Sequence, residues 1–377
     1  MADAKTISPA ELKRRLDERK VEFLFDLRNE DEFKAWRIEG REDFPALNIP
    51  QVDFVGEEDL YMDRFPKDKE IIAVCAHGDS SRYSAELLTE KGFKAVNLEG
   101  GMDLWSEYYE THKVSDTPLI YQIYRTARGC MTHIVVSGGE AFVIDANRHV
   151  EKIIAFVDSL GAKITHVVDT HLHADHISGG IDLAQKTGAP FFMNPVDAEG
   201  ATFKFEELID GMEIKFGGNN FLAIQTPGHT LGITSLLLNG KHLFTGDTIM
   251  KTDMGRPDLG GKAEEWSGML YNTLFKKLKS LGDDIMILPS HADSIKEQDE
   301  NGIVSLTLGG ARRDSALFRL TDYKEFINYI LSSIEEIPKS YHEMRKANLG
   351  IIFPDEAKKK ELEIGKNLCV MKKPEQA

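Results

Sequence analysis

The stretch Thr170-His171-Leu172-His173-Ala174-Asp175-His176 places three imidazoles and a carboxylate within six residues. It follows Ile164-Thr165-His166-Val167-Val168, a largely β-branched run that predicts a buried strand. The histidines are therefore expected where that strand ends and the chain turns over a sheet edge. So many ligand atoms in one place are costly to remove from water unless a cation compensates them. The H-x-H-x-D-H pattern therefore predicts a metal site.

Three later segments repeat the same arrangement of a strand, a turn-forming residue and a ligand-capable side chain. Runs at 221–224, 241–245 and 284–288 predict strands, and they are followed by Gly228-His229, Gly246-Asp247 and Ser290-His291. Each segment alone is a weak signal, but the series after H-x-H-x-D-H is a strong one. Over about residues 118 to 310, the chain resembles the metallo-β-lactamase superfamily. That resemblance implies a four-layered αββα sandwich with metals at one sheet edge.

The first hundred residues carry a separate signal around Cys75. Residues 70–74 predict a buried strand that runs directly into a loop over 75–81, and residues 82–91 have helical spacing before Gly92. Ser8-Pro9-Ala10-Glu11 predicts the start of an earlier helix. Backbone N–H groups in such a loop and the N-terminus of the following helix favour an anion. The loop is therefore expected to favour the Cys75 thiolate as a nucleophile.

These motifs resemble a single-domain rhodanese over roughly residues 5 to 110. The matching segments are Asp26-Leu27-Arg28, Cys75-x-His77-Gly78-x-Ser80-Ser81 and Leu98-Glu99-Gly100-Gly101-Met102-x-x-Trp105. The resemblance implies that Cys75 carries sulfane sulfur as a persulfide. It also implies that the sulfur is bound by the loop residues His77, Gly78, Asp79, Ser80 and Ser81. Many rhodaneses have arginine where Ser80 stands, so the sulfur donor stays open.

The predicted organisation is therefore an α/β chain of two domains. A rhodanese domain covers 1–110, a polar linker ending in proline covers 111–118, and a metallo-β-lactamase-like domain with a helical C-terminal extension covers 119–377. The segment 322–337 has an amphipathic helical pattern, interpreted as core or as an oligomer contact, which leaves a homo-oligomer open.

The amino-acid composition limits which classes of partner and which cellular compartment are expected. The net charge of −16 disfavours nucleic acid and anionic membranes as main partners. No apolar run approaches the roughly 20 residues that span a bilayer, and the N-terminus has no apolar signal segment. Three cysteines are too few for a disulfide framework, which predicts a reduced, cytoplasmic protein. Besides Cys75, the cysteines Cys130 and Cys369 are interpreted as small buried hydrophobic residues.

Two members of the superfamily have nearly the same ligands. Glyoxalase II uses two metals to hydrolyse a thioester, and persulfide dioxygenases use one iron. Gly255-Arg256-Pro257-Asp258-Leu259 looks like the persulfide dioxygenase signature, and the attached rhodanese handles the same substrate class. This resemblance implies one Fe(II) per chain and a substrate-pocket role for Arg256. The implied iron ligands are His171, His229 and Asp247, and the positions that match the superfamily's second site, left without metal, are His173, Asp175, His176 and His291.

The expected function is oxidation of a low-molecular-weight thiol persulfide by dioxygen to sulfite, coupled to sulfur transfer through Cys75, with thiosulfate or sulfite as a further partner. Relatives that use glutathione usually have a tyrosine where Asp293 stands, so the thiol is of the glutathione or the coenzyme A type. Two alternatives remain open. One is a dinuclear zinc thioester hydrolase with an accessory rhodanese, and the other is a non-catalytic sulfur carrier or sensor.

Overall fold

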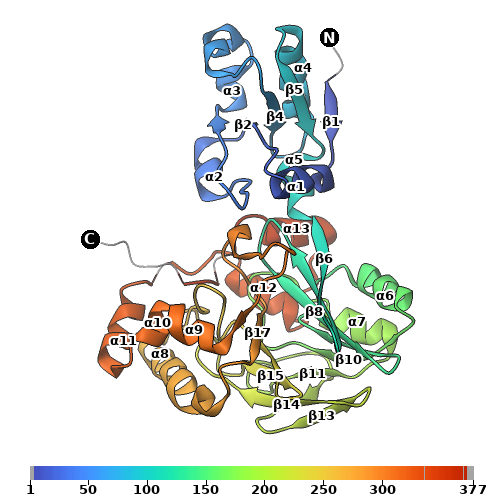
Figure 1. Ribbon diagram of the computed structural model, residues 1–377, viewed down its shortest axis with the longest axis vertical. Coiled ribbons are helices and arrows are strands. Elements are labelled where there is room, and N and C mark those ends of the chain that lie inside the picture. Colours follow the sequence, from blue (N-terminus) through green and yellow to red (C-terminus); the bar gives the residue numbers. More distant parts are fainter. Residues whose placement is uncertain (1–3, 335, 368, 372–377) are drawn as a thin grey trace.

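A five-stranded parallel sheet in the order β1-β5-β4-β2-β3 forms the amino-terminal domain of the computed structural model (Figure 1). The structure describes residues 4–334, 336–367 and 369–371. The strands are β1 (Lys5–Ile7), β2 (Phe23–Asp26), β3 (Ala46–Asn48), β4 (Glu70–Val74) and β5 (Lys94–Leu98). The helices are α1 (Pro9–Asp17), α2 (Glu30–Ala35), α3 (Gln51–Phe54), α4 (Asp79–Glu90) and α5 (Gly101–Ser106), with short 3₁₀ turns η1 (Glu58–Leu60) and η2 (Met62–Arg64).

Local sequence explains how this domain presents its loop. The Ser8 hydroxyl caps α1 by accepting a hydrogen bond from the Glu11 amide at 3.2 Å, as the capping box predicts. Helix α4 begins at Asp79, three residues before the expected Arg82, because Gly78 turns the chain with φ +95°. A side chain at Gly78 would place its Cβ 2.7 Å from the Gly100 amide nitrogen. The loop after β4 is therefore short and tightly packed.

Two further sheets form the second domain. The seven-stranded sheet has the order β12-β11-β10-β9-β8-β7-β6, and the six-stranded sheet has the order β13-β14-β15-β16-β17-β18. The first comprises β6 (Tyr109–Asp116), β7 (Leu119–Arg125), β8 (Met131–Ser137), β9 (Glu140–Ile144), β10 (Lys163–Val168), β11 (Phe191–Met193) and β12 (Glu206–Glu207). The second comprises β13 (Glu213–Phe216), β14 (Asn219–Gln225), β15 (Thr234–Leu238), β16 (His242–Gly246), β17 (Met286–Pro289) and β18 (Leu306–Thr307).

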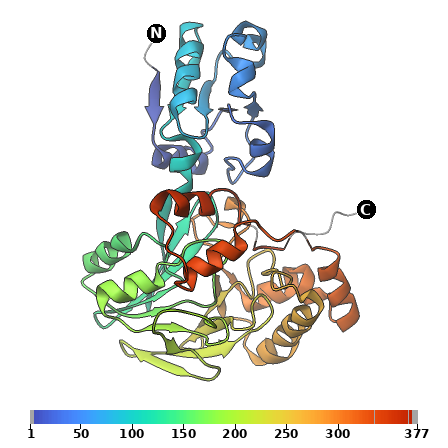
Figure 2. The same cartoon turned by 180° about the vertical axis from the view of Figure 1, so that it is seen from behind.

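The two sheets pack face to face, and helices cover their outer faces (Figures 1 and 2). Phe142, Phe221 and Phe244 lie in the core between the sheets. Helices α6 (Val150–Ser159) and α7 (Gly180–Thr187) cover the first sheet, and α8 (Ala263–Asn272) and α11 (Tyr323–Leu331) cover the second. The other helical segments are η3 (Thr273–Lys277), η4 (Leu278–Ser280), η5 (Ile295–Glu297), α9 (Leu308–Asp314), α10 (Ala316–Arg319), α12 (Tyr341–Asn348) and α13 (Glu356–Glu363). The predicted αββα sandwich is confirmed.

The predicted linker over 111–118 needs correction. Residues 109–116 form strand β6, which pairs antiparallel with β7 at the edge of the seven-stranded sheet. The segment is polar because an edge strand is exposed on one side, where polar and charged residues discourage pairing with other chains. Polarity alone therefore did not distinguish an edge strand from a connecting segment. The seven-stranded sheet therefore begins shortly after α5, at Tyr109.

The helix in the segment 322–337 is shorter than its amphipathic pattern predicts. Helix α11 ends at Leu331, and Phe326, Ile327 and Ile330 are buried against the second sheet. This part of the stripe belongs to the core of the domain, whereas Leu331 and Ile334 are exposed. In the described ranges, none of the helices combines the length and apolar character that a membrane crossing requires.

Buried charges join the two domains around Glu107, which follows α5. Its carboxylate lies 2.6 Å from Arg148 Nη2 and 2.8 Å from His149 Nε2. Arg148 Nε lies 2.9 Å from Glu363 Oε2, so the same cations also hold the C-terminal helix α13. Burial opposes ionisation of Glu107, but His149, Arg125 and Arg148 outweigh it and lower the pKa of Glu107 to about 2. The domain junction is thus stabilised by an ionised carboxylate.

We expect Glu107→Gln to destabilise the protein at pH 7 by on the order of 3 kcal/mol, because it removes one of the two carboxylates that Arg125 and Arg148 contact. The folded-state pKa lies below the ordinary 4.5. The stabilisation is therefore complete above about pH 4.5 and is lost as the pH falls toward 2. Thermal unfolding measured across this range should show a weaker acid dependence for the variant. An unchanged melting temperature at pH 7, equal to that of the exposed control Glu199→Gln, would contradict this account.

Candidate metal centre and cysteine loop

Strand ends bring His171, His229 and Asp247 to one edge of the sandwich. His171 follows β10, His229 follows β14, and Asp247 follows β16. The Nε2 atoms of His171 and His229 lie 3.8 and 3.6 Å from Asp247 Oδ2. All three side chains are buried, and their ligand atoms lie within 4.8 Å of one another. We refer to these three residues as the first cluster.

The first cluster fits one metal ion. Among the described residues, His171 Nε2 and Asp247 Oδ2 have no hydrogen-bond partner although both atoms are buried. Such groups are expensive to bury unless a cation compensates them. Two ligand atoms that are each about 2.1 Å from a metal ion stand roughly 3.0–3.5 Å apart, close to the separations seen here. Two imidazoles and one carboxylate would leave further coordination positions open.

Neighbouring groups orient the two imidazoles. His229 Nδ1 donates to the Arg256 carbonyl at 2.9 Å, which directs Nε2 toward Asp247. His171 Nδ1 hydrogen-bonds with the Thr170 hydroxyl at 3.0 Å. Burial lowers the pKa of both histidines, and for His171 the neighbouring imidazoles add to this effect. Both are therefore neutral at physiological pH, the form that binds metals.

A second cluster adjoins the first and consists of Cys130, Asp175, His176 and His291. His291 Nδ1 lies 2.5 Å from Asp247 Oδ1, and its Nε2 lies 2.8 Å from Asp175 Oδ2. His176 Nδ1 lies 3.2 Å from Asp175 Oδ1, and Cys130 Sγ donates to Asp175 Oδ2 at 3.3 Å. His291 therefore connects the carboxylates of the two clusters. Unlike the first cluster, this one pairs its charges internally.

Cys130 is buried as expected, with 5% of its surface exposed, but its sulfur lies among ionisable groups rather than in an apolar environment. Burial and Asp175 oppose its ionisation, but His291 and His176 outweigh them and lower the pKa of Cys130 to about 7. The residue pairs with His291 in an isolated β-bridge, a contact that joins positions 161 residues apart. No local spacing could have predicted it. Cys369 is buried as expected, with 3% of its surface exposed, and its carbonyl accepts from the Arg256 amide.

The ring of His173 lies beside the second cluster, 4.3 Å from the ring of His176 between centroids, but its ligand atom faces another carboxylate. Its Nε2 lies 3.1 Å from Asp145 Oδ1, and it groups with Asp145 and Asp169. Asp145 was missed by the sequence analysis. Its carboxylate accepts from the Thr170 amide at 2.7 Å and from the Ser290 hydroxyl, so it holds the residues that precede His171 and His291. Asp145 follows β9, the same strand-then-carboxylate pattern that identified Asp247, and this signal could have revealed it.

Arg256 is buried beside the first cluster. Its Nε and Nη2 lie 3.0 and 2.7 Å from the two carboxylate oxygens of Asp258. Its visible contribution to the first cluster is the carbonyl that orients His229. The role in substrate binding stays a prediction.

The cysteine loop surrounds the Cys75 sulfur with donors. Sγ accepts hydrogen bonds from the Gly78 amide at 3.0 Å, the Ser81 amide at 3.4 Å and the Ser81 hydroxyl at 3.2 Å. A pocket of about 370 Å³ opens over Cys75, and His77, Asp79 and Ser80 line it. The loop can therefore stabilise a negatively charged sulfur at the end of a substrate-sized opening.

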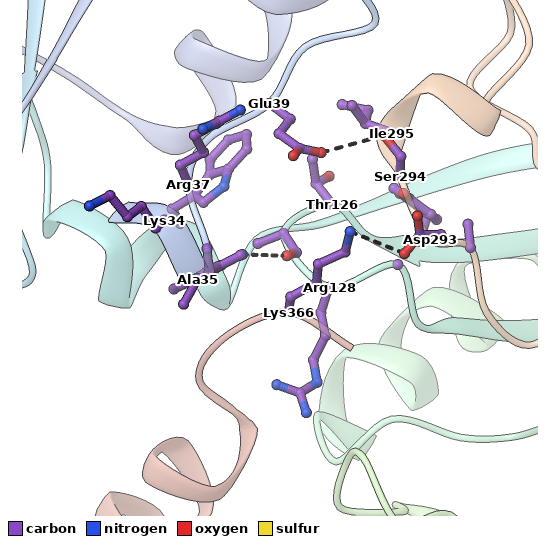
Figure 3. Close-up of a pocket in the computed structure, with 16 residues that line it drawn as sticks. Lys34, Ala35, Arg37, Glu39, Thr126, Arg128, Asp293, Ser294, Ile295 and Lys366 are labelled. Atoms are coloured by element: carbon purple, nitrogen blue, oxygen red, sulfur yellow. Dashed lines mark hydrogen bonds and ion pairs between the residues drawn. The ribbon is translucent and has the colours of Figure 1, made fainter. Parts of the chain in front are cut away.

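A smaller pocket of about 160 Å³ lies between the two domains (Figure 3). Trp36 Nε1 donates across the junction to the Ala127 carbonyl at 3.0 Å. Lys366 Nζ lies 3.1 Å from an Asp293 carboxylate oxygen on another side of the pocket. Gly129 and Ala292 also line it, and they are the chain neighbours of Cys130 and His291. Two residues that line the pocket at the domain junction thus directly adjoin residues of the second cluster in the sequence.

Comparisons with known proteins agree with this architecture. The model of the rhodanese-like domain matches residues 8–108, and that of the metallo-beta-lactamase superfamily matches residues 125–291. A hydroxyacylglutathione hydrolase from Polaromonas sp. is 31% identical over 233 residues, which cover 58% of this chain and 83% of that protein. The chain belongs to the metallo-beta-lactamase superfamily. The rhodanese-like domain lies before the segment that matches this superfamily.

Other relatives are named for an activity that differs from that of the hydroxyacylglutathione hydrolases. Persulfide dioxygenase ETHE1 from Homo sapiens is 31% identical over 137 residues, covering 36% of this chain and 52% of that protein. The crystal structure of ETHE1 from Myxococcus xanthus has a TM-score of 0.52 at 25% identity and covers 65% of this chain and 99% of that one. The chain spans only 57% and 62% of the length of two hydroxyacylglutathione hydrolases that are 30% identical to it, from Rhodospirillum rubrum and Acidiphilium cryptum. Membership therefore establishes a metal-binding fold and leaves the reaction to be argued.

We expect Asp247→Asn to reduce metal binding by at least tenfold, because it removes the only carboxylate of the first cluster and leaves neutral ligands. Metal content after dialysis against a weak chelator measures the effect. The reactivity of Cys75 toward a thiol reagent should stay at its normal level, since this residue lies in the other domain. Asp182→Asn, an exposed change on α7, serves as the control. Equal metal content in the two variants would contradict the assignment of the first cluster.

Proposed function

We propose that this protein is a non-haem iron persulfide dioxygenase that oxidises a low-molecular-weight thiol persulfide to sulfite, with a rhodanese-like domain that transfers sulfur through Cys75. The observation that carries the proposal is the contrast between the two clusters. Buried ligand atoms without a hydrogen-bond partner occur in both clusters, His171 Nε2 and Asp247 Oδ2 in the first and His291 Nε2 in the second. His291 Nε2 nevertheless lies 2.8 Å from Asp175 Oδ2, whereas His171 Nε2 and Asp247 Oδ2 are 3.8 Å apart and leave room for an ion between them. This contrast supports the binding of one metal ion rather than two. Two histidines and one carboxylate are the ligand set of many mononuclear iron oxygenases.

Iron at the first cluster would supply coordination positions for the persulfide sulfur and for dioxygen. The overall reaction consumes a thiol persulfide, dioxygen and water and yields the free thiol and sulfurous acid, which ionises to sulfite. His171, His229 and Asp247 would hold the metal. The pair of His291 and Asp175 lies next to Asp247 and offers a group that can hold or release a proton at His291 Nε2.

The amino-terminal domain would handle sulfur before or after this oxidation. The Cys75 thiolate attacks the outer sulfur of a persulfide or thiosulfate donor, the sulfur–sulfur bond breaks, and the thiolate or sulfite of the donor leaves. The Cys75 persulfide then receives the hydrogen bonds from Gly78 and Ser81 that the thiol sulfur receives in the structure. A small thiol takes the outer sulfur and regenerates the Cys75 thiolate. With sulfite as the acceptor, the same chemistry produces thiosulfate.

The name of the human relative agrees with the proposal, and the names of the hydroxyacylglutathione hydrolases support a second candidate. This candidate is a dinuclear, zinc-dependent thioester hydrolase. The completeness of the second cluster favours it, because Asp175, His176 and His291 could hold another ion. The rhodanese-like domain favours the dioxygenase, since a sulfane sulfur carrier serves no step of thioester hydrolysis. A protein that only carries or senses sulfur would not need the uncompensated first cluster.

We expect the purified, aerobically handled protein to contain about one iron per chain and to consume oxygen when given a thiol persulfide. Elemental analysis and an oxygen electrode measure the two quantities. Glutathione persulfide and coenzyme A persulfide, compared side by side, identify the thiol that is preferred. Two zinc ions per chain, together with no oxygen uptake after reconstitution with iron, would favour the hydrolase and exclude the proposed reaction.

Cys75→Ser should abolish sulfur transfer, because a hydroxyl of much higher pKa cannot carry sulfur at neutral pH. Oxygen uptake from a persulfide that is supplied ready-made should continue, whereas uptake from thiosulfate plus thiol should stop. If the domain instead consumes sulfite, the variant should accumulate sulfite in place of thiosulfate. Time courses of both products test the coupling. Oxygen demand and product ratios that do not depend on Cys75 would leave the amino-terminal domain outside the reaction.

A further inference from the structure

The loop that carries the H-x-H-x-D-H motif is held by helices from the far end of the chain. Residues 169–178 lie outside any helix or extended strand, and α12 and α13 pack over them. Ile177 of the loop is buried together with Met344 of α12 and Leu362 of α13. Both helices follow the segment 125–291 that matches the superfamily model. This chain therefore supports its metal loop with residues beyond the part that defines the family.

Asn348, the last residue of α12, makes three hydrogen bonds with the backbone of this loop. Its Nδ2 donates to the carbonyls of His173 at 2.9 Å and His176 at 2.8 Å. Its Oδ1 accepts from the Ser178 amide at 3.0 Å. Only 6% of its surface is exposed. One buried amide thus satisfies three backbone groups over six consecutive residues.

We propose that Asn348 is a positioning residue for the metal centre, acting through the loop that carries His171, Asp175 and His176. The inference rests on the proposed metal site, but it holds for iron and for zinc and does not depend on which reaction the site performs. A side-chain amide is suited to this task because it offers two donors and an acceptor in one plane. The carbonyls that it binds belong to His173 and His176, the two histidines that follow His171 in the loop.

The loop connects Asn348 to the first cluster through short contacts. Asp175 and His176 contact each other, Asp175 contacts His291, and His291 contacts Asp247. A shift of the loop backbone would therefore reach the carboxylate ligand as well as His171. Removing Asn348 would also leave two buried carbonyls unsatisfied, at a cost of about 1–3 kcal/mol each unless the loop moves to find other partners. Relaxation of the loop is thus the expected response.

Glu363 and Arg128 also hold this loop, but they are less suitable for a test. Glu363 accepts from the Ile177 amide at 2.8 Å, and Arg128 donates to the Asp175 carbonyl at 2.6 Å. Glu363 also pairs with Arg125 and Arg148 at the domain junction, so a change there would disturb two systems. Among the described residues, the Asn348 amide forms hydrogen bonds only with this loop. A change at Asn348 therefore tests the position of the loop without disturbing the contacts between the domains.

The test measures Co(II) binding by the full-length protein. Asn348→Ala should weaken Co(II) affinity by about 10–100-fold, the usual effect of removing groups that orient metal ligands. The visible d–d spectrum of bound Co(II) should also change, because it reports the coordination geometry. Asn348→Gln retains the amide on a side chain one methylene longer and should restore part of the affinity. Competition with a chelator gives the affinities without any measurement of oxygen uptake.

Met344→Ala is the matched control, because it removes an apolar contact of the same helix with Ile177 and leaves the amide contacts intact. We expect it to lower the melting temperature while Co(II) affinity stays within about threefold of the wild type. Wild-type affinity and spectrum in a folded Asn348→Ala variant would overturn the proposal. So would an equal loss of affinity in Met344→Ala, since packing alone would then explain the effect. A wild-type protein that binds Co(II) but consumes no oxygen with a thiol persulfide after reconstitution with iron would refute the proposed reaction and leave this inference standing.

Discussion

Burial of ligand atoms without hydrogen-bond partners is the constraint on which the second domain depends. His171 Nε2 and Asp247 Oδ2 lie in the interior, at the edge where strands from both sheets end. Desolvation of such groups is unfavourable by several kcal/mol in the absence of a cation. The sandwich compensates for this with a large apolar core between its sheets, to which Phe142, Phe221 and Phe244 contribute. The fold thus stabilises a site that is unfavourable by itself.

The junction between the domains depends on charge in a different way. Glu107, Arg125, Arg148 and Glu363 come from four separate segments, and each cation contacts both carboxylates. Because every charge has a partner, this network can be buried without a metal. It also fixes α13, which packs on the loop of the H-x-H-x-D-H motif. The same C-terminal segment therefore contributes to the arrangement of the domains and to the geometry around the metal ligands.

The sequence predicted the clustering of the ligands from local patterns, the two domains from chain length and two separate sets of motifs, and the sandwich from the family resemblance that those motifs carry. A strand followed by a ligand-capable residue is visible within ten residues, and parallel strands bring such residues to one edge. The contacts that it could not predict join distant positions. Cys130 meets His291, Asn348 meets His173, and Trp36 meets Ala127 only after the chain has folded. The edge strand β6 was mistaken for a linker because its pairing partner is needed to recognise it.

The difference between the two clusters gives a physical basis for choosing among reactions that share a ligand set. Asp175 has a protein partner on each oxygen, and His291 lies between two carboxylates, so this cluster is neutralised without an ion. A metal at this position would have to displace these contacts, whereas a metal at the first cluster would satisfy atoms that otherwise have no partner. We therefore expect an ion to bind more tightly at the first cluster than at the second. This expectation is the basis of the proposal of one metal with open coordination positions, for which the Cys75 loop would be the source of sulfane sulfur.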